Sequence, residues 1–65
     1  MKTNLDRVIG MKGIVTQDIV PMNIGEIKVD GKLWSAISDE KLVTGDIVEI
    51  LQIDGVKLKV KKWED

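Results

Sequence analysis

The chain has 65 residues, of which 43% are apolar, and its 10 basic and 11 acidic side chains leave a net charge of −1. This length limits the fold to one domain with a thin core, and the mixed charge indicates an ordinary soluble surface rather than a polyanion-seeking one. Cysteine and histidine are absent, which excludes a disulfide framework and a structural zinc site, so we expect neither a metal nor a cofactor.

No segment has the roughly 18 consecutive apolar residues that a membrane span requires. Glu49 interrupts the longest apolar run, residues 47–53, and residues 1–7 lack the apolar core of a signal peptide. We therefore expect the chain to be soluble as given, without inserting into a membrane by itself. A location at a membrane is expected only if the chain is part of a longer protein.

Residues 1–9 are interpreted as a lead-in segment, because Leu5, Val8 and Ile9 have helical spacing over barely one turn. Residues 10–63 are expected to form the domain.

The first strand is predicted over residues 12–20. Its alternation places Val15, Gln17 and Ile19 on one face, and Pro21 ends the strand because proline has no N–H for the ladder.

The second and third strands flank Asp30-Gly31, a pair that favours a two-residue type I′ turn because both central positions need a positive φ. This register pairs Ile27 with Trp34 on the core face. A one-residue change of loop length would set Trp34 against Glu26 instead, so the two-residue turn is favoured.

The fourth and fifth strands flank Asp54-Gly55. A two-residue loop would place a glutamate of the fourth strand on the apolar side. A three-residue loop with a bulge at Gly55 avoids this and pairs Ile50 with Leu58, so we favour the three-residue loop.

Residues 38–45 are too short for a full helix and are expected to form a tight crossover. Five short strands without a long helix predict an all-β fold, a small five-stranded barrel whose closure removes exposed strand edges. The residues expected to carry this fold are turn glycines and inward side chains, namely Gly13, Gly25, Ile27, Gly31, Trp34, Ala36, Gly45, Val48, Ile50, Gly55, Leu58 and Val60.

Catalytic chemistry has few candidates. Without histidine or cysteine, nucleophilic catalysis is left with Ser35 or Ser38 beside Lys32 or Lys41, which we interpret as ordinary surface groups. The adjacent carboxylates at 39–40 need not converge on one substrate. We therefore expect no enzyme activity.

A basic stripe along the fifth strand offers an alternative function. Small barrels bind single-stranded nucleic acids through such a stripe together with stacking aromatic side chains. Only two aromatic residues are present, Trp34 is predicted to face inward, and the isoelectric point near 5.3 argues against a strong phosphate footprint. The stripe consists of Lys57, Lys59, Lys61 and Lys62.

Short motifs follow one another in a distinctive order: residues 9–15 (IGMKGIV), 18–21 (DIVP), 25–31 (GEIKVDG), 31–36 (GKLWSA), 45–50 (GDIVEI) and 58–60 (LKV). Their order and spacing resemble the soluble C-terminal domain of NfeD-type membrane proteins over nearly the whole chain after residue 8. Three residues separate Pro21 from Gly25 where that family usually has one. Gln17 stands where a threonine is usual, and Leu33 occupies an outward position that is normally polar.

The resemblance implies an oligonucleotide-binding-type (OB) barrel that is attached to a membrane-spanning region in full-length relatives. It also implies that the barrel engages stomatin-like membrane scaffold proteins. Longer relatives add a serine protease domain of the Ser–Lys kind, which has no match in this chain, so no catalytic residue is carried over.

The leading hypothesis is therefore a non-catalytic adaptor in membrane organisation or membrane protease regulation, on the cytoplasmic side when it belongs to a longer protein. A single-stranded nucleic-acid-binding OB domain is the alternative.

Candidate protein-binding residues are those that combine apolar or basic character with a predicted outer face. Single exposed aliphatic side chains are common on soluble proteins, so their grouping matters more than their individual exposure. The candidates are Leu33, Ile37, Ile47, Leu51, Lys57 and Lys59.

Overall fold

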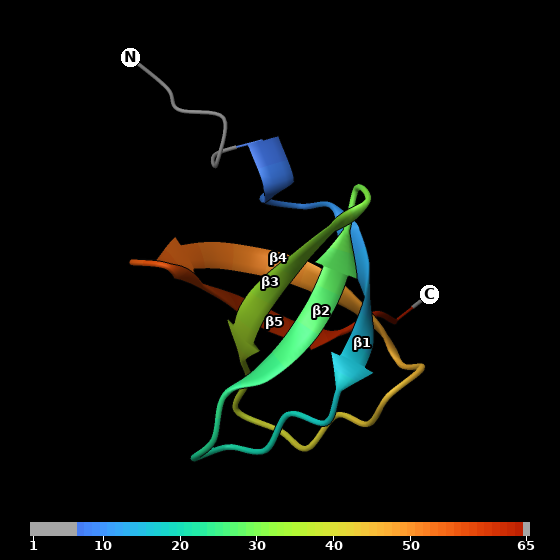
Figure 1. The fold of residues 1–65 in the computed structure, drawn as a ribbon, viewed down its shortest axis with the longest axis vertical. Helices are drawn as coiled ribbons and strands as arrows, with labels where there is room; N and C mark the ends of the chain where they lie inside the picture. Colours follow the sequence, from blue (N-terminus) through green and yellow to red (C-terminus); the bar gives the residue numbers. More distant parts are fainter. Residues whose placement is uncertain (1–6, 65) are drawn as a thin grey trace.

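The computed structural model describes residues 7–64, and its five β-strands close into a barrel (Figure 1). The strands are β1 (Lys12–Gln17), β2 (Gly25–Val29), β3 (Lys32–Ile37), β4 (Ile47–Asp54) and β5 (Lys57–Lys62). Their order around the barrel is β1-β2-β3-β5-β4, and only the β3–β5 pair is parallel. The predicted all-β, five-stranded barrel is confirmed. Within residues 7–64 no helix is long and apolar enough to cross a membrane.

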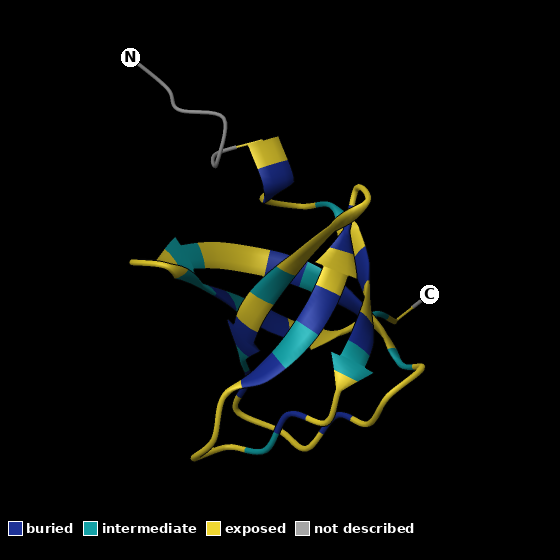
Figure 2. Cartoon of the chain, viewed as in Figure 1, coloured by how far each residue is buried: buried dark blue, intermediate teal, exposed yellow. Residues whose placement is uncertain are grey.

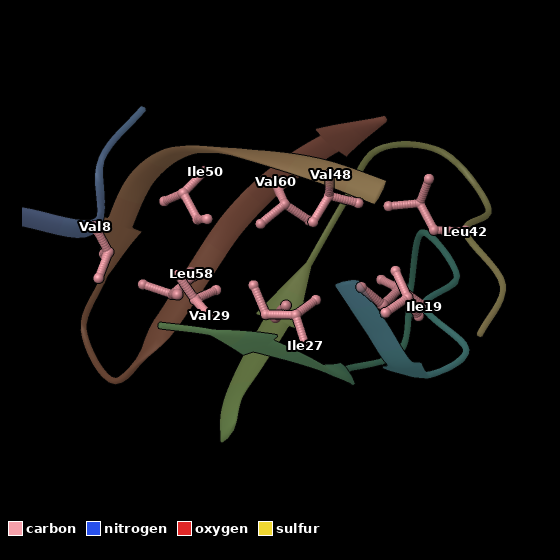
Figure 3. Close-up of a cluster of buried hydrophobic side chains, with 11 residues drawn as sticks. Val8, Ile19, Ile27, Val29, Leu42, Val48, Ile50, Leu58 and Val60 are labelled. Carbon is pink, nitrogen blue, oxygen red and sulfur yellow. The ribbon is translucent and has the colours of Figure 1, made fainter. Parts of the chain in front are cut away.

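The core is built from the inward side of every strand, because alternate residues of a strand point to opposite faces (Figure 2). Figure 3 shows these side chains meeting along the barrel axis, with Val8 at one end and Ile19 and Leu42 at the other. Fully burying one such aliphatic side chain contributes about 1.5–3 kcal/mol. The remaining core residues are Val15, Ile27, Val29, Ala36, Val48, Ile50, Leu58 and Val60.

Part of the expected lead-in segment belongs to this core. Residues 1–6 lie outside the described residues, but Val8 is buried and its carbonyl accepts a hydrogen bond from the Met11 amide at 2.9 Å. The Gly10 amide donates to the Ile50 carbonyl at 2.8 Å. These bonds fix Val8 over the open end of the barrel, so packing begins before residue 10.

The β2–β3 hairpin has the predicted turn and register. Asp30 and Gly31 have φ values of 51° and 78°, as a type I′ turn requires. Ile27 pairs with Trp34 and Val29 with Lys32.

The predicted register of the β4–β5 hairpin was wrong. The turn is Gly55-Val56, because Asp54 pairs with Lys57, and Gly55 takes the positive φ of 67° at the first central position. A bulge lies within β4, between Ile50 and Gln52, rather than at the turn. Ile50 consequently faces Val60, and Leu58 faces Ile53.

The first strand is shorter than predicted and ends at Gln17. A register shift between Val15 and Gln17 turns Gln17 to the surface, so it does not share the inward face of Val15. Ile19 still reaches the core, because its amide and carbonyl each form a 2.8 Å hydrogen bond with the backbone of Leu42.

Candidate protein-binding groove

A surface hollow of about 340 Å³ lies beside the end of β3. It is lined by loop residues 21–24, by residues 37–39 at the end of β3, and by Lys57 and Lys59 of β5. We call this hollow the β3–β5 groove. In Figure 1 the loop between β1 and β2 lies beyond the arrowhead of β3, at the lower end of the barrel.

Strand order explains the two walls of the groove. Loop residues 21–24 lead into β2, which pairs with one edge of β3, whereas β5 pairs with the other edge. The loop wall and the β5 wall therefore lie on opposite sides of the end of β3. Ile37, which is half-buried, lies between them.

The parallel β3–β5 pairing brings the outward side chains together. Ile37 pairs with Lys59, and the preceding pair, Ala36 with Leu58, faces the core. Because side chains alternate along a strand, Lys57 and Lys59 both point away from the core, on either side of buried Leu58.

The loop wall is apolar and strongly exposed. The Asn23 amide donates to the Val20 carbonyl at 3.0 Å, which closes a tight turn after Pro21. This turn holds Met22 at 93% exposure and Ile24 at 56% exposure. These residues occupy the stretch in which the chain is longer than the NfeD pattern, and sequence reasoning did not single them out as binding candidates.

The opposite wall is basic, and one of its charges is already paired. Lys59 Nζ lies 3.4 Å from Asp39 Oδ2, and the Asp39 side chain is 88% exposed. Ser38 is buried beside it, and its Oγ accepts a hydrogen bond from the Glu40 amide at 3.1 Å, which fixes the bend that carries Asp39. Among the described residues, Lys57 forms no ion pair.

The six predicted binding residues separate into distinct places. Ile37, Lys57 and Lys59 come together in the β3–β5 groove. Leu51 lies in the β4 bulge, outside the groove lining.

Leu33 and Ile47 belong to a different surface. Cross-strand pairing aligns them with two further outward residues, in the order Ile47, Ile14, Lys28 and Leu33, across β4, β1, β2 and β3. We call this set the outer row. Ile14, Leu33 and Ile47 are all exposed, and the outward position of Ile14 followed from strand alternation although it was not among the candidates.

The groove offers no base-stacking platform, because none of its lining residues is aromatic. Trp34 packs against the core while half-buried, which agrees with its predicted inward placement only in part. The ammonium group of Lys12 lies over the Trp63 ring, 4.1 Å from the ring centroid.

A second hollow of about 260 Å³ lies beside Trp34, Val8 and the β2–β3 turn. The indole Nε1 of Trp34 is buried there and has no hydrogen-bond acceptor within the described structure. None of the six predicted binding residues lines this second hollow, whereas three of them line the β3–β5 groove, so the groove is the candidate site.

Metal-binding groups do not assemble in the described part of the chain. Ser38 Oγ is committed to the Glu40 amide, and residues 7–64 contain no cluster of three or more acidic side chains able to hold a metal ion.

Comparison with known proteins identifies the family. The family model for the NfeD-like C-terminal, partner-binding domain matches residues 5–62. An uncharacterized protein of Methanocaldococcus jannaschii is 41% identical over 64 residues, which cover 98% of this chain and 46% of that protein. The chain thus spans about half the length of this curated relative.

Two solved structures share both fold and sequence. The C-terminal domain of stomatin operon partner protein 1510-C from Pyrococcus horikoshii has a TM-score of 0.86 and 33% identity, covering 98% of this chain and 100% of that one. The soluble domain of a Corynebacterium glutamicum membrane protein implicated in regulation of membrane protease activity has a TM-score of 0.80 and 28% identity, covering 88% and 94%. The chain therefore belongs to the family of NfeD-like C-terminal, partner-binding domains.

Proposed function

We propose that this domain is a non-catalytic adaptor that binds a stomatin-like membrane protein through the β3–β5 groove, and thereby acts in membrane organisation or membrane protease regulation. Two similarities support this: the Pyrococcus relative is a stomatin operon partner protein, and the Corynebacterium relative is implicated in regulating membrane protease activity. In a longer, membrane-attached protein, the proposal places the domain on the cytoplasmic side.

The observation that carries the proposal is the convergence of apolar and basic side chains in one groove. Met22 and Ile24 form one wall, and Lys57 and Lys59 form the other. A standard interface covers about 800 Å² per partner, roughly a sixth of the 4550 Å² surface of the chain. An interface of that size would therefore extend from the groove onto the surface around it.

The test is capture of a purified stomatin-like protein by the domain and by the double variant Met22→Glu/Ile24→Glu. Both side chains are exposed, so we expect an unchanged unfolding midpoint but a loss of capture, because two carboxylates would replace the apolar wall. Leu33→Glu/Ile47→Glu, which places two carboxylates on the outer row instead, is the matched control and should capture normally.

The wild-type result and the control separate two ways of failing. Absence of capture by the wild-type domain would overturn the adaptor function. Loss of capture in Leu33→Glu/Ile47→Glu, with normal capture by the loop variant, would move the site from the β3–β5 groove to the outer row.

A further inference from the structure

The two walls of the β3–β5 groove differ in chemistry, and the basic wall has the spacing of a strand. Lys57 and Lys59 are two residues apart on β5, so their stems are separated by roughly 6.6 Å along the strand. Met22 and Ile24 are also two residues apart, on the opposite wall. An extended segment between the walls would direct alternate side chains to each of them.

Asp39 shows what chemical group the basic wall accepts. Its carboxylate pairs with Lys59 from a strongly exposed position, and exposed pairs of this kind contribute little to stability. An incoming carboxylate can therefore replace Asp39 at small cost. Lys57, two residues earlier, forms no ion pair in the described structure and is open to a second carboxylate.

We infer that the β3–β5 groove takes an extended partner segment in which acidic and aliphatic residues alternate, and that Asp39 competes with the partner for Lys59. The acidic side chains pair with Lys57 and Lys59, and the aliphatic side chains pack on Met22, Ile24 and Ile37. The inference rests on the proposed function, because it specifies the chemistry of the partner at the same groove.

The probe is a capped six-residue peptide of alternating glutamate and leucine, with a glutamine–leucine peptide as its neutral match. In an NMR titration of the whole chain, the acidic peptide should shift the amides of Ile24, Ile37, Lys57 and Lys59 saturably. The neutral peptide should bind more weakly. Equal affinity of the two peptides would overturn the inference.

Two variants test the charges individually. Lys57→Gln should weaken binding of the acidic peptide about two- to fivefold, the range of an exposed ion pair, and Asp39→Asn should strengthen it by a similar factor. Lys61→Gln is the matched control on β5, since Lys61 lies outside the groove and 4.0 Å from Glu49. Asp30→Asn, in the β2–β3 turn, is the control for Asp39. An unchanged affinity in Asp39→Asn would overturn the competition.

Two further outcomes separate this inference from the proposed function. If the variant Lys57→Gln/Lys59→Gln captures the stomatin-like protein normally while Met22→Glu/Ile24→Glu does not, the adaptor function stands and the acidic-segment inference falls. If the acidic peptide binds as expected but the stomatin-like protein does not, the inference stands and the adaptor function falls.

A titration with a twelve-residue oligothymidylate tests the nucleic-acid alternative. Shifts of the Lys57 and Lys59 amides with this oligonucleotide, but not with the acidic peptide, would replace the inference with nucleic-acid binding.

Discussion

At the scale of single residues, Gly25 determines how the loop wall of the groove meets the barrel. A Cβ at this position would lie 2.5 Å from the Asp18 carbonyl oxygen and 2.7 Å from that of Gln17. Both contacts are with backbone, which cannot move without displacing the β1–β2 loop. At Gly13 a Cβ would meet a methyl group of Val29 at 2.7 Å and the Lys28 carbonyl oxygen at 3.1 Å, so the nearest backbone atom lies farther away than at Gly25.

We therefore predict that Gly25→Ala lowers the free energy of unfolding by about 3 kcal/mol or more, and Gly13→Ala by about 1–2 kcal/mol. A domain of this size has a total stability of only about 3–10 kcal/mol, so Gly25→Ala should leave the barrel barely folded. Urea denaturation followed by tryptophan fluorescence measures both. A larger loss in Gly13→Ala than in Gly25→Ala would show that the backbone contacts at Gly25 yield more easily than the structure indicates.

At the scale of elements, two loops are tied together at the end of the barrel that Ile19 and Leu42 close. Asp18 Oδ1 accepts hydrogen bonds from the Thr44 amide at 2.8 Å and from the Thr44 hydroxyl at 3.0 Å. The amide bond and then the hydroxyl bond lower the pKa of Asp18 below its ordinary value of 3.8, and Lys41 adds a smaller effect in the same direction. Both bonds favour the charged carboxylate.

This lowered pKa gives the loops a pH dependence. The stabilisation is fully present above the ordinary pKa of 3.8 and is lost as the pH falls from there through the lower pKa of the folded state. We predict that Asp18→Asn is less stable than the wild type at neutral pH and loses less stability on acidification to about pH 2. Chemical denaturation at several pH values measures the free energy of unfolding of both proteins. Parallel dependence of this free energy on pH would show that Asp18 contributes nothing to the pH dependence.

The hairpins show which parts of the fold sequence reasoning can predict. The β2–β3 register was predictable because Asp30 and Gly31 both suit a positive φ, and one register alone turns Trp34 inward. At the second hairpin, glycine took the first turn position, and a bulge inside β4 restored the inward faces. The alternation of apolar residues indicates that one of the two strands needs a bulge to keep its apolar side chains inward. It does not indicate at which residue the bulge occurs.

At the scale of the whole molecule, the site depends on a long-range contact. Alternation predicts that Ile37 and Lys59 each lie on an outer face, but only the parallel β3–β5 pairing makes them neighbours. No local pattern encodes that pairing, so three of the six predicted residues, Ile37, Lys57 and Lys59, line the proposed groove, but its location could not be predicted from the sequence. Met22 and Ile24 were missed because apolar residues in a turn carry no periodic signal.

Whether the domain binds a stomatin-like partner through the β3–β5 groove is tested most directly by NMR titration of the isotope-labelled chain with that partner. We predict saturable shifts or line broadening at residues 21–24, at 37–39 and at Lys57 and Lys59, with the outer row unaffected. Perturbation centred on Ile14, Leu33 and Ile47, with the groove unaffected, would contradict this assignment and place the interface on the outer row.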